Sequence, residues 1–108
     1  MTDLEMTKLC AEAMGIVLDG IPSAPSYFDS DKTENGCIIF YDPIHDDAQA
    51  MALVKKFGLC IEQYAPDSAS GSRVYLPGYW KRGVKFMSNL NRAIVECVAR
   101  MQAAKKEV

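Results

Sequence analysis

The fold is decided by residues 41–64, YDPIHDDAQAMALVKKFGLCIEQY, which read as a buried helix followed directly by a short strand. Asp42 suits the N-cap of this helix, and Pro43 suits its first position, where the missing N–H group costs nothing. Acidic residues then fall in the first turn and two lysines in the last, as the helix dipole favours. Gly58 supplies a left-handed exit, and residues 59–64 follow as a strand.

Two further helices are expected outside this unit. Thr2 and Glu5 form a capping box at the start of the first helix, which Gly15 ends. Ser88 suits the N-cap of the last helix, whose apolar stripe recurs at three- and four-residue steps as far as Met101.

The remaining chain contributes short strands and one long loop. Residues 37–41 are β-branched and aromatic, and residues 59–64 and 73–76 read as the two strands of a hairpin. Residues 19–36 combine prolines, glycines and acidic residues without periodicity, so we expect a long acidic loop there. The sequence therefore predicts one α/β (α+β) domain over residues 1–108, in which a small, mostly antiparallel sheet of three to four strands is layered with three helices.

The core of this domain is predicted from the apolar positions of the helices and strands. Side chains that recur on one face of a helix or strand are expected to be buried together. These residues are Met6, Leu9, Met14, Met51, Val54, Phe57, Ile61, Val74, Ile94, Val98 and Met101.

The bulk composition is that of an ordinary globular protein. The chain has 108 residues, of which 49% are hydrophobic and 24% charged, which is enough for one domain with a single core. No apolar run approaches the roughly 20 residues that a membrane-spanning helix needs. The acidic N-terminal segment is unlike a signal peptide, so we expect a cytoplasmic protein without a membrane partner.

The four cysteines, Cys10, Cys37, Cys60 and Cys97, are far apart in the sequence and form no Cys-x-x-Cys pair. Most of them fall on apolar faces, where cysteine acts as a small buried hydrophobe. We therefore expect reduced, unligated thiols in a reducing cytoplasm rather than a disulfide or zinc framework.

The net charge of −2 conceals an asymmetry between the two halves of the chain. Residues 1–54 hold ten acidic and two basic residues, for a net of −8, and residues 55–108 hold four acidic and ten basic residues, for a net of +6. The favoured interpretation is that the charges of the two halves pair across the surface. The alternative is a basic face that meets an anionic ligand or an acidic face of another subunit.

Three segments resemble a known family. They are residues 41–48 (YDPIHDDA), residues 73–76 (RVYL) and residues 90–94 (LNRAI). Their order resembles the small ABA-sandwich domain of phage and prophage proteins, and the resemblance covers roughly residues 41–101. Because the members of this family have no agreed function, the resemblance implies a phage or prophage origin, the host bacterial cytoplasm and a fold, but no catalytic residue.

The sequence favours a non-enzymatic protein without a metal or a cofactor. His45 is the single histidine and precedes Asp46 and Asp47, but neighbouring helical residues point about 100° apart and cannot all chelate one ion. A helix N-terminus with favourable charge is the preferred interpretation of this triplet. No nucleophile context and no glycine-rich phosphate loop is recognisable, so no catalytic residue is assigned.

The best binding candidate is an aromatic and basic segment late in the chain. Aromatic planes beside cations suit stacked bases and phosphates, although the same residues could simply close the edge of the core. The overall acidity argues against double-stranded nucleic acid. The candidate ligand-binding residues are Arg73, Tyr79, Trp80, Lys81 and Arg82.

Two functions of different classes remain open. The first is a phage or prophage accessory protein that acts as an interaction module for a host or phage protein, either as a single chain or as a homo-oligomer. The alternative is a small-molecule binder that sequesters an anionic nucleotide-like ligand through residues 73–85.

Overall fold

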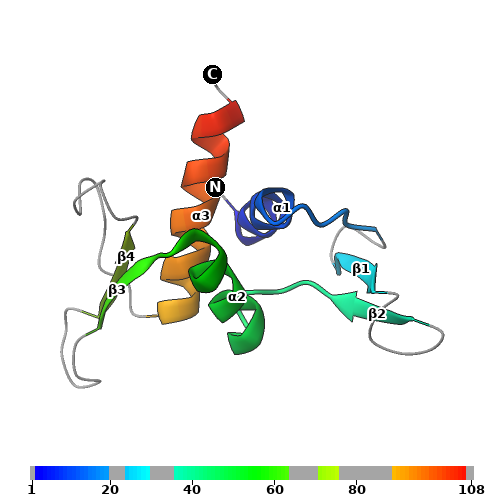
Figure 1. The fold of residues 1–108 in the computed structure, drawn as a ribbon, viewed down its shortest axis with the longest axis horizontal. Coiled ribbons are helices and arrows are strands. Elements are labelled where there is room, and N and C mark those ends of the chain that lie inside the picture. The colour runs from blue at the N-terminus through cyan, green and yellow to red at the C-terminus, as the bar shows by residue number, and fades with distance from the viewer. Residues whose placement is uncertain (1, 20–23, 30–35, 64–70, 76–88, 107–108) are drawn as a thin grey trace.

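The structure is a computed structural model that describes residues 2–19, 24–29, 36–63, 71–75 and 89–106. Figure 1 shows three helices at the centre of the molecule, with one β-hairpin on either side of them. In chain order, the elements of the described residues are α1 (Asp3–Ala13), β1 (Ser26–Asp29), β2 (Cys37–Phe40), α2 (Asp47–Phe57), β3 (Cys60–Gln63), β4 (Ser72–Tyr75) and α3 (Leu90–Lys106).

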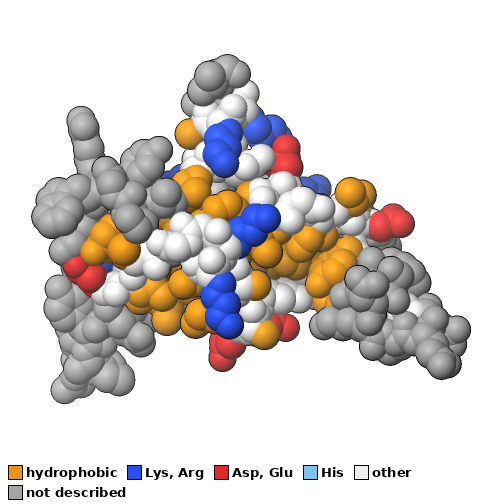
Figure 2. Space-filling view, viewed as in Figure 1, with side chains coloured by type: hydrophobic (Ala, Val, Ile, Leu, Met, Phe, Trp, Pro, Cys, Tyr) orange, Lys and Arg blue, Asp and Glu red, His pale blue; other side chains and the backbone are white. Residues whose placement is uncertain are grey.

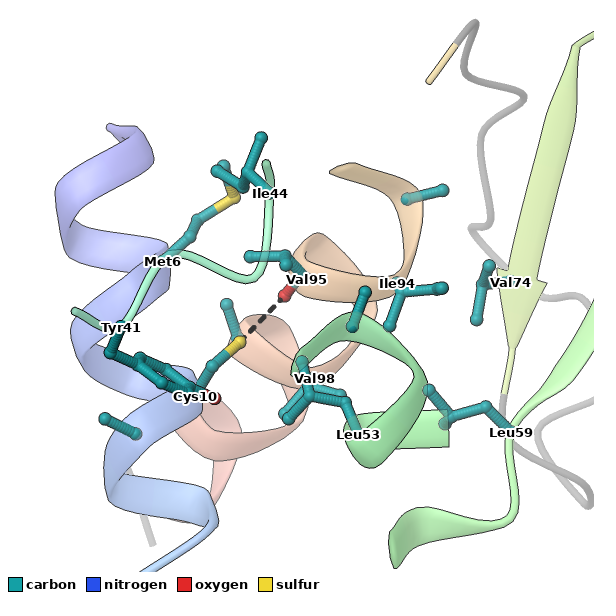
Figure 3. Close-up of a cluster of buried hydrophobic side chains, with 14 residues drawn as sticks. Met6, Cys10, Tyr41, Ile44, Leu53, Leu59, Val74, Ile94, Val95 and Val98 are labelled. Carbon is teal, nitrogen blue, oxygen red and sulfur yellow. Dashed lines mark hydrogen bonds between the residues drawn. The ribbon is translucent and has the colours of Figure 1, made fainter. Parts of the chain in front are cut away.

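The core surrounds α3, which contacts α1, α2 and β4. Figure 3 shows how side chains from these elements converge on α3. Packing of this kind removes apolar area from water and is the main favourable contribution to folding. The buried hydrophobic residues are Met6, Cys10, Ala11, Tyr41, Ile44, Ala50, Leu53, Leu59, Val74, Ala93, Ile94, Val95, Val98 and Ala99.

Helix α1 forms as its sequence predicts. The Thr2 hydroxyl accepts a hydrogen bond from the Glu5 N–H at 3.1 Å, and the Glu5 carboxylate accepts one from the Thr2 N–H at the same distance. These reciprocal bonds are the predicted capping box. The helix ends at Ala13, with Met14 as its C-cap and Gly15 beyond it at a φ of 74°. A positive φ favours glycine, which explains why the helix stops there.

Helix α2 begins four residues later than predicted. Asp46 is its N-cap, and the Asp46 carboxylate accepts a hydrogen bond from the Gln49 N–H at 3.0 Å. The expected cap, Asp42, instead opens a turn that the His45 N–H closes on the Asp42 carbonyl at 3.1 Å. This turn buries Pro43 and Ile44 in the core, so tertiary packing overrides the first of two local capping signals.

The C-terminal end of α2 agrees with the prediction. Gly58 adopts the left-handed conformation, with φ 62° and ψ 44°, and its N–H donates to the carbonyl of Val54. Helix α3 starts beside the predicted cap: the Asn89 side chain accepts a hydrogen bond from the Arg92 N–H at 2.9 Å. The predicted cap Ser88 lies outside the described residues.

The described strands form two separate antiparallel sheets of two strands each. The predicted hairpin is confirmed, because β3 pairs with β4 with Ile61 opposite Val74. The predicted strand at 37–41 is also confirmed as β2, which pairs with β1. The described residues therefore show a mixed α+β architecture but do not confirm the predicted single sheet of three to four strands, because the helices lie between the two hairpins (Figure 1).

Strand β1 lies inside the range that the sequence predicts to be one long loop. Its segment lacks polar and apolar alternation, so its strand character arises from pairing with β2, in which Tyr27 lies opposite Ile39. Residues 20–23 and 30–35 of that predicted loop fall outside the described part of the chain.

The predicted core is confirmed in part, with one clear error in α2. Met51 is 43% exposed, whereas Leu53 on the same helix is fully buried. The helix turns Ala50 and Leu53 toward α3, which leaves Met51 on its flank. Four of the predicted residues are buried and six are half-buried against them; these are Met6, Val74, Ile94 and Val98, and Leu9, Met14, Val54, Phe57, Ile61 and Met101, respectively.

Charged residues of the two sequence halves meet along α1 and α3. The Arg92 guanidinium lies 2.5 Å from the Asp3 carboxylate, and the Lys106 ammonium lies 3.3 Å from that of Glu12. Both pairs join the acidic half to the basic half, as the favoured interpretation of the charge asymmetry predicts. Exposed pairs of this kind contribute about 0–1 kcal/mol each, so they add little to the packing of α1 on α3.

None of the helices in the described ranges combines the length and the apolar character that a transmembrane span requires.

Two thiols make the stability of this core dependent on alkaline pH. Burial raises the pKa of the Cys10 thiol to about 12 and that of the Cys97 thiol to about 11. Because the folded pKa values exceed the ordinary value of roughly 8.5, the neutral thiols stabilise the fold below that pH. This contribution is lost as the pH rises from about 9 toward the folded pKa values, because the unfolded chain then releases protons that the folded chain retains.

We therefore expect the free energy of unfolding to fall between about pH 9 and pH 11, with a slope of up to about 1.4 kcal/mol per pH unit from each thiol. Replacing Cys10 with Ala removes one titrating thiol and should make this slope shallower by up to that amount. Urea unfolding of both proteins across this pH range measures the difference. Parallel pH profiles for the two proteins would show that Cys10 titrates normally.

Candidate interaction surface

Of the five residues of the predicted ligand site, Arg73 is the one that lies within the described residues. Arg73 lies on β4 opposite Glu62 of β3, and its Nε donates to the Glu62 carboxylate at 2.5 Å. The two side chains are only 20% and 24% exposed, so the guanidinium is held within the hairpin. Tyr79, Trp80, Lys81 and Arg82 lie outside the described residues, and the nucleotide-like ligand of the alternative reading stays a prediction.

A different surface is exposed on the opposite hairpin. Ile38 and Phe40 of β2 are 66% and 65% exposed. They share one face of the strand because side chains two residues apart point the same way. Exposed apolar side chains that lie together in one patch can mark a binding surface, whereas single ones are common on any protein. Ile38 and Phe40 are hereafter called the β2 face.

Tyr41 anchors the β2 face to the helices. Its side chain follows Phe40 but points the opposite way, and it is 3% exposed. The ring packs edge-on against Tyr27, with centroids 6.2 Å apart, and the Tyr41 N–H donates to the Pro25 carbonyl at 2.9 Å. Figure 3 shows the ring extending from the end of the hairpin toward α1, beside Cys10. The hairpin is thus held at its base by a buried aromatic residue.

The Tyr41 hydroxyl is buried and has no hydrogen-bond partner among the described residues. Burial raises the pKa of this phenol well above its usual range, with the nearby Cys10 thiol adding to the effect. A buried hydroxyl without a partner costs about 1–3 kcal/mol relative to its state in water. The anchor therefore stabilises the hairpin through its ring and not through its hydroxyl.

Gln49 of α2 fixes the chain on both sides of Tyr41. Its side-chain Nε2 donates to the Phe40 carbonyl at 2.8 Å, and its Oε1 accepts from the Asp42 N–H at 2.6 Å. The opposite assignment of the amide atoms would leave both contacts repulsive, so the orientation follows from the partners. These two hydrogen bonds, hereafter called the Gln49 clamp, fix the direction in which the strand leaves the helices and so position Phe40.

An open groove of about 400 Å³ lies next to Phe40. Apolar side chains also reach the surface between α1 and the segment that joins β2 to α2 on the face drawn in Figure 2, on which His45 of the groove is not visible. The groove is built from the first turns of α1, from the chain before β1, and from the turn before α2. Its lining residues are Asp3, Leu4, Thr7, Ala24, Pro25, Phe40, Tyr41, Asp42, Ile44 and His45.

The rim of the groove carries its ionisable groups. His45 Nδ1 lies 2.8 Å from a carboxylate oxygen of Asp42; the His45 side chain is largely exposed and that of Asp42 is half exposed. Across the groove, the hydrogen bond from Arg92 lowers the pKa of the Asp3 carboxyl, and Asp3 correspondingly raises the pKa of Arg92. Thr7 is buried, and its hydroxyl donates to the Asp3 carbonyl at 2.8 Å, so it serves its own helix.

The structure separates the His45-Asp46-Asp47 triplet into different roles. Asp46 caps α2 and Asp47 lies in its first turn, as the helix N-terminus interpretation predicts. His45 instead pairs with Asp42, three residues earlier in the turn. Within the described ranges, no three residues of the metal-binding types gather closely enough to hold an ion.

A second open pocket, of about 460 Å³, lies between α2 and the start of α3. Asp47 and Met51 line it on the α2 side, and the Asn91 side chain donates to the Asp47 carboxylate at 2.7 Å. Met51 is the exposed apolar residue of this region. It provides a comparison for Phe40 because the two side chains lie in different pockets.

Comparison of the chain with protein-family models, with curated proteins and with solved structures found no match. The phage or prophage origin that the resemblance implies therefore stays a prediction. The function has to be argued from the β2 face and the groove beside it.

Proposed function

We propose that the protein is a non-enzymatic interaction module that binds a partner protein through the β2 face and the adjoining groove. The observation that carries the proposal is the exposure of Ile38 and Phe40 by about two thirds on a strand whose base is fixed. From the resemblance to phage and prophage proteins, we propose that this partner is a host or phage protein of the bacterial cytoplasm.

The energetic argument rests on burial. Covering a large apolar side chain contributes roughly 1.5–3 kcal/mol relative to leaving it in water. In the isolated chain, Ile38 and Phe40 remain largely in contact with water, so most of this free energy is not gained on folding. A partner that covers the two side chains gains it on binding. Aromatic residues in preformed positions are typical centres of binding energy in protein interfaces.

Preorganisation supports the same conclusion. The Tyr41 anchor and the Gln49 clamp hold the backbone of Phe40 by a buried ring and two hydrogen bonds. A surface that is already ordered loses less conformational entropy when a partner binds. The Thr7 hydroxyl in the groove already donates a hydrogen bond to the Asp3 carbonyl of its own helix. This contact favours a binding role of the groove over nucleophilic catalysis.

Site-specific photo-crosslinking tests the proposal inside bacterial cells. A photoreactive amino acid at Ile38 should give a discrete crosslinked adduct with one partner protein, which mass spectrometry identifies. The same amino acid at Met51 is the matched control, because Met51 is also exposed and apolar but lies in the second pocket. Equal adducts from both positions, or an adduct from Met51 alone, would place the interface elsewhere.

A further inference from the structure

We propose that the groove beside Phe40 recognises a segment of the partner protein in which a basic residue lies next to an apolar one. In this complex, the cation binds the Asp42 carboxylate and the apolar side chain packs on Phe40. The inference rests on the proposed function and specifies the chemistry of the partner.

The apolar half of the recognition follows from the groove itself. Leu4, Pro25 and Ile44 line it together with Phe40, and its volume of about 400 Å³ accepts a large side chain. Recognition grooves for short segments commonly combine such apolar walls with a few polar groups that fix orientation. The apolar walls therefore favour a large apolar side chain, and the charged groups of the rim determine which kind of residue can lie next to it.

The charged half follows from the carboxylates of the rim. Asp3 is already paired with Arg92 at 2.5 Å, so its charge is compensated within the chain. Asp42 contacts His45, and in the described part of the chain no lysine or arginine pairs with it. Its side chain is half exposed at the groove, where a cation can reach it.

Two neighbouring carboxylates add to the negative charge around Asp42. Asp46 and Asp47 follow within five positions of Asp42, both are exposed, and neither forms an ion pair with a described lysine or arginine. Three carboxylates thus lie in one short segment that runs from the groove into α2. Such a field attracts a cationic segment and repels phosphates and other anions.

A second copy of this chain is the weaker candidate for the occupant. Its exposed lysines that form no ion pair with a described acidic residue all lie on helices of the folded chain; they are Lys8, Lys55, Lys56 and Lys105. Arg100 and Lys106 are paired with Glu96 and Glu12. A second copy would therefore have to present its cation from a rigid helix. A segment of a different protein can adapt its backbone to the groove and place a cation and an apolar side chain next to each other.

Selection from a displayed library of random short peptides tests the inference. Peptides that bind the wild-type chain should be enriched in arginine or lysine close to a large apolar residue. On the Asp42→Asn variant, the apolar preference should persist while the basic enrichment disappears. A selected peptide should bind this variant on the order of tenfold more weakly, which is the scale of one lost charged hydrogen bond.

The control variant is Glu12→Gln, which also removes one exposed carboxylate but lies at the other end of α1, paired with Lys106. It should bind the selected peptide as the wild type does. Circular dichroism verifies that each variant is folded.

The two ideas fail in different ways. Selected peptides that need Phe40 but show no basic enrichment, or that bind Asp42→Asn equally well, would overturn the inference and leave the proposed function intact. Peptides that bind Phe40→Ser as tightly as wild type would overturn the proposed function itself. Self-association that Asp42→Asn abolishes would identify a second copy as the occupant and would also overturn the inference.

Discussion

Replacing Ile94 with Ala is expected to lower the free energy of unfolding by about 2–5 kcal/mol. Ile94 is 1% exposed on α3 and belongs to the cluster that joins this helix to α2 and β4. Truncation removes three buried carbon atoms and leaves a cavity that close-packed neighbours fill only in part. Urea unfolding monitored by circular dichroism measures the loss.

The matched control is Met51→Ala. Met51 is 43% exposed on α2, so its truncation removes little buried area and should cost less than about 1 kcal/mol. A loss from Met51→Ala as large as that from Ile94→Ala would mean that α2 packs with a different face toward α3.

Replacing Tyr41 with Ala is expected to cost about 3–5 kcal/mol, the range typical of deleting a buried aromatic ring. The ring is one of the contacts that tie the β1–β2 hairpin to the helices, and it packs edge-on against Tyr27. Its loss should therefore also expose the hairpin, which amide hydrogen exchange of residues 37–41 would detect as lost protection.

Replacing Tyr41 with Phe separates the ring from the hydroxyl. The ring contacts remain, and the hydroxyl without a described partner is removed, so stability should stay the same or rise by about 1 kcal/mol. If Tyr41→Phe destabilised the protein as much as Tyr41→Ala, the hydroxyl would be forming a structural hydrogen bond and the ring would not be the anchor.

Local signals in the sequence predicted the elements that depend on them. The capping box of α1, the left-handed Gly58 and the hairpin of β3 and β4 are all present as expected. The capping box and the Gly58 cap are each determined by residues within a few positions of one another, and the two strands of the hairpin by the residue pattern of each segment. Tertiary packing supports these local preferences, so sequence and structure agree.

Where two equivalent local signals compete, the sequence could not choose between them. Asp42 followed by Pro43 and Asp46 followed by Asp47 are both acceptable helix starts. The choice is made by the burial of Pro43 and Ile44, which a turn permits. Strand β1 was missed for a different reason: its segment lacks polar and apolar alternation, so only its pairing with β2 reveals it as a strand.

The candidate surface could be predicted only in part. Period-two alternation shows that Ile38 and Phe40 share one face of a strand and that Tyr41 points to the other. It does not show which of these faces the helices cover, since all three residues are apolar. The pairing of His45 with Asp42 was also missed, because it depends on a turn where the sequence suggested a helix.

The most direct test of the central claim is the dissociation constant of the crosslinked partner for two variants, measured with purified proteins. Phe40→Ser should weaken binding roughly 30-fold or more, because central aromatic residues of interfaces contribute about 2 kcal/mol or more. Met51→Ser should leave the dissociation constant within a factor of about two of the wild-type value. Equal affinities of wild type and Phe40→Ser, with both proteins folded, would contradict the assignment of the β2 face as the binding surface.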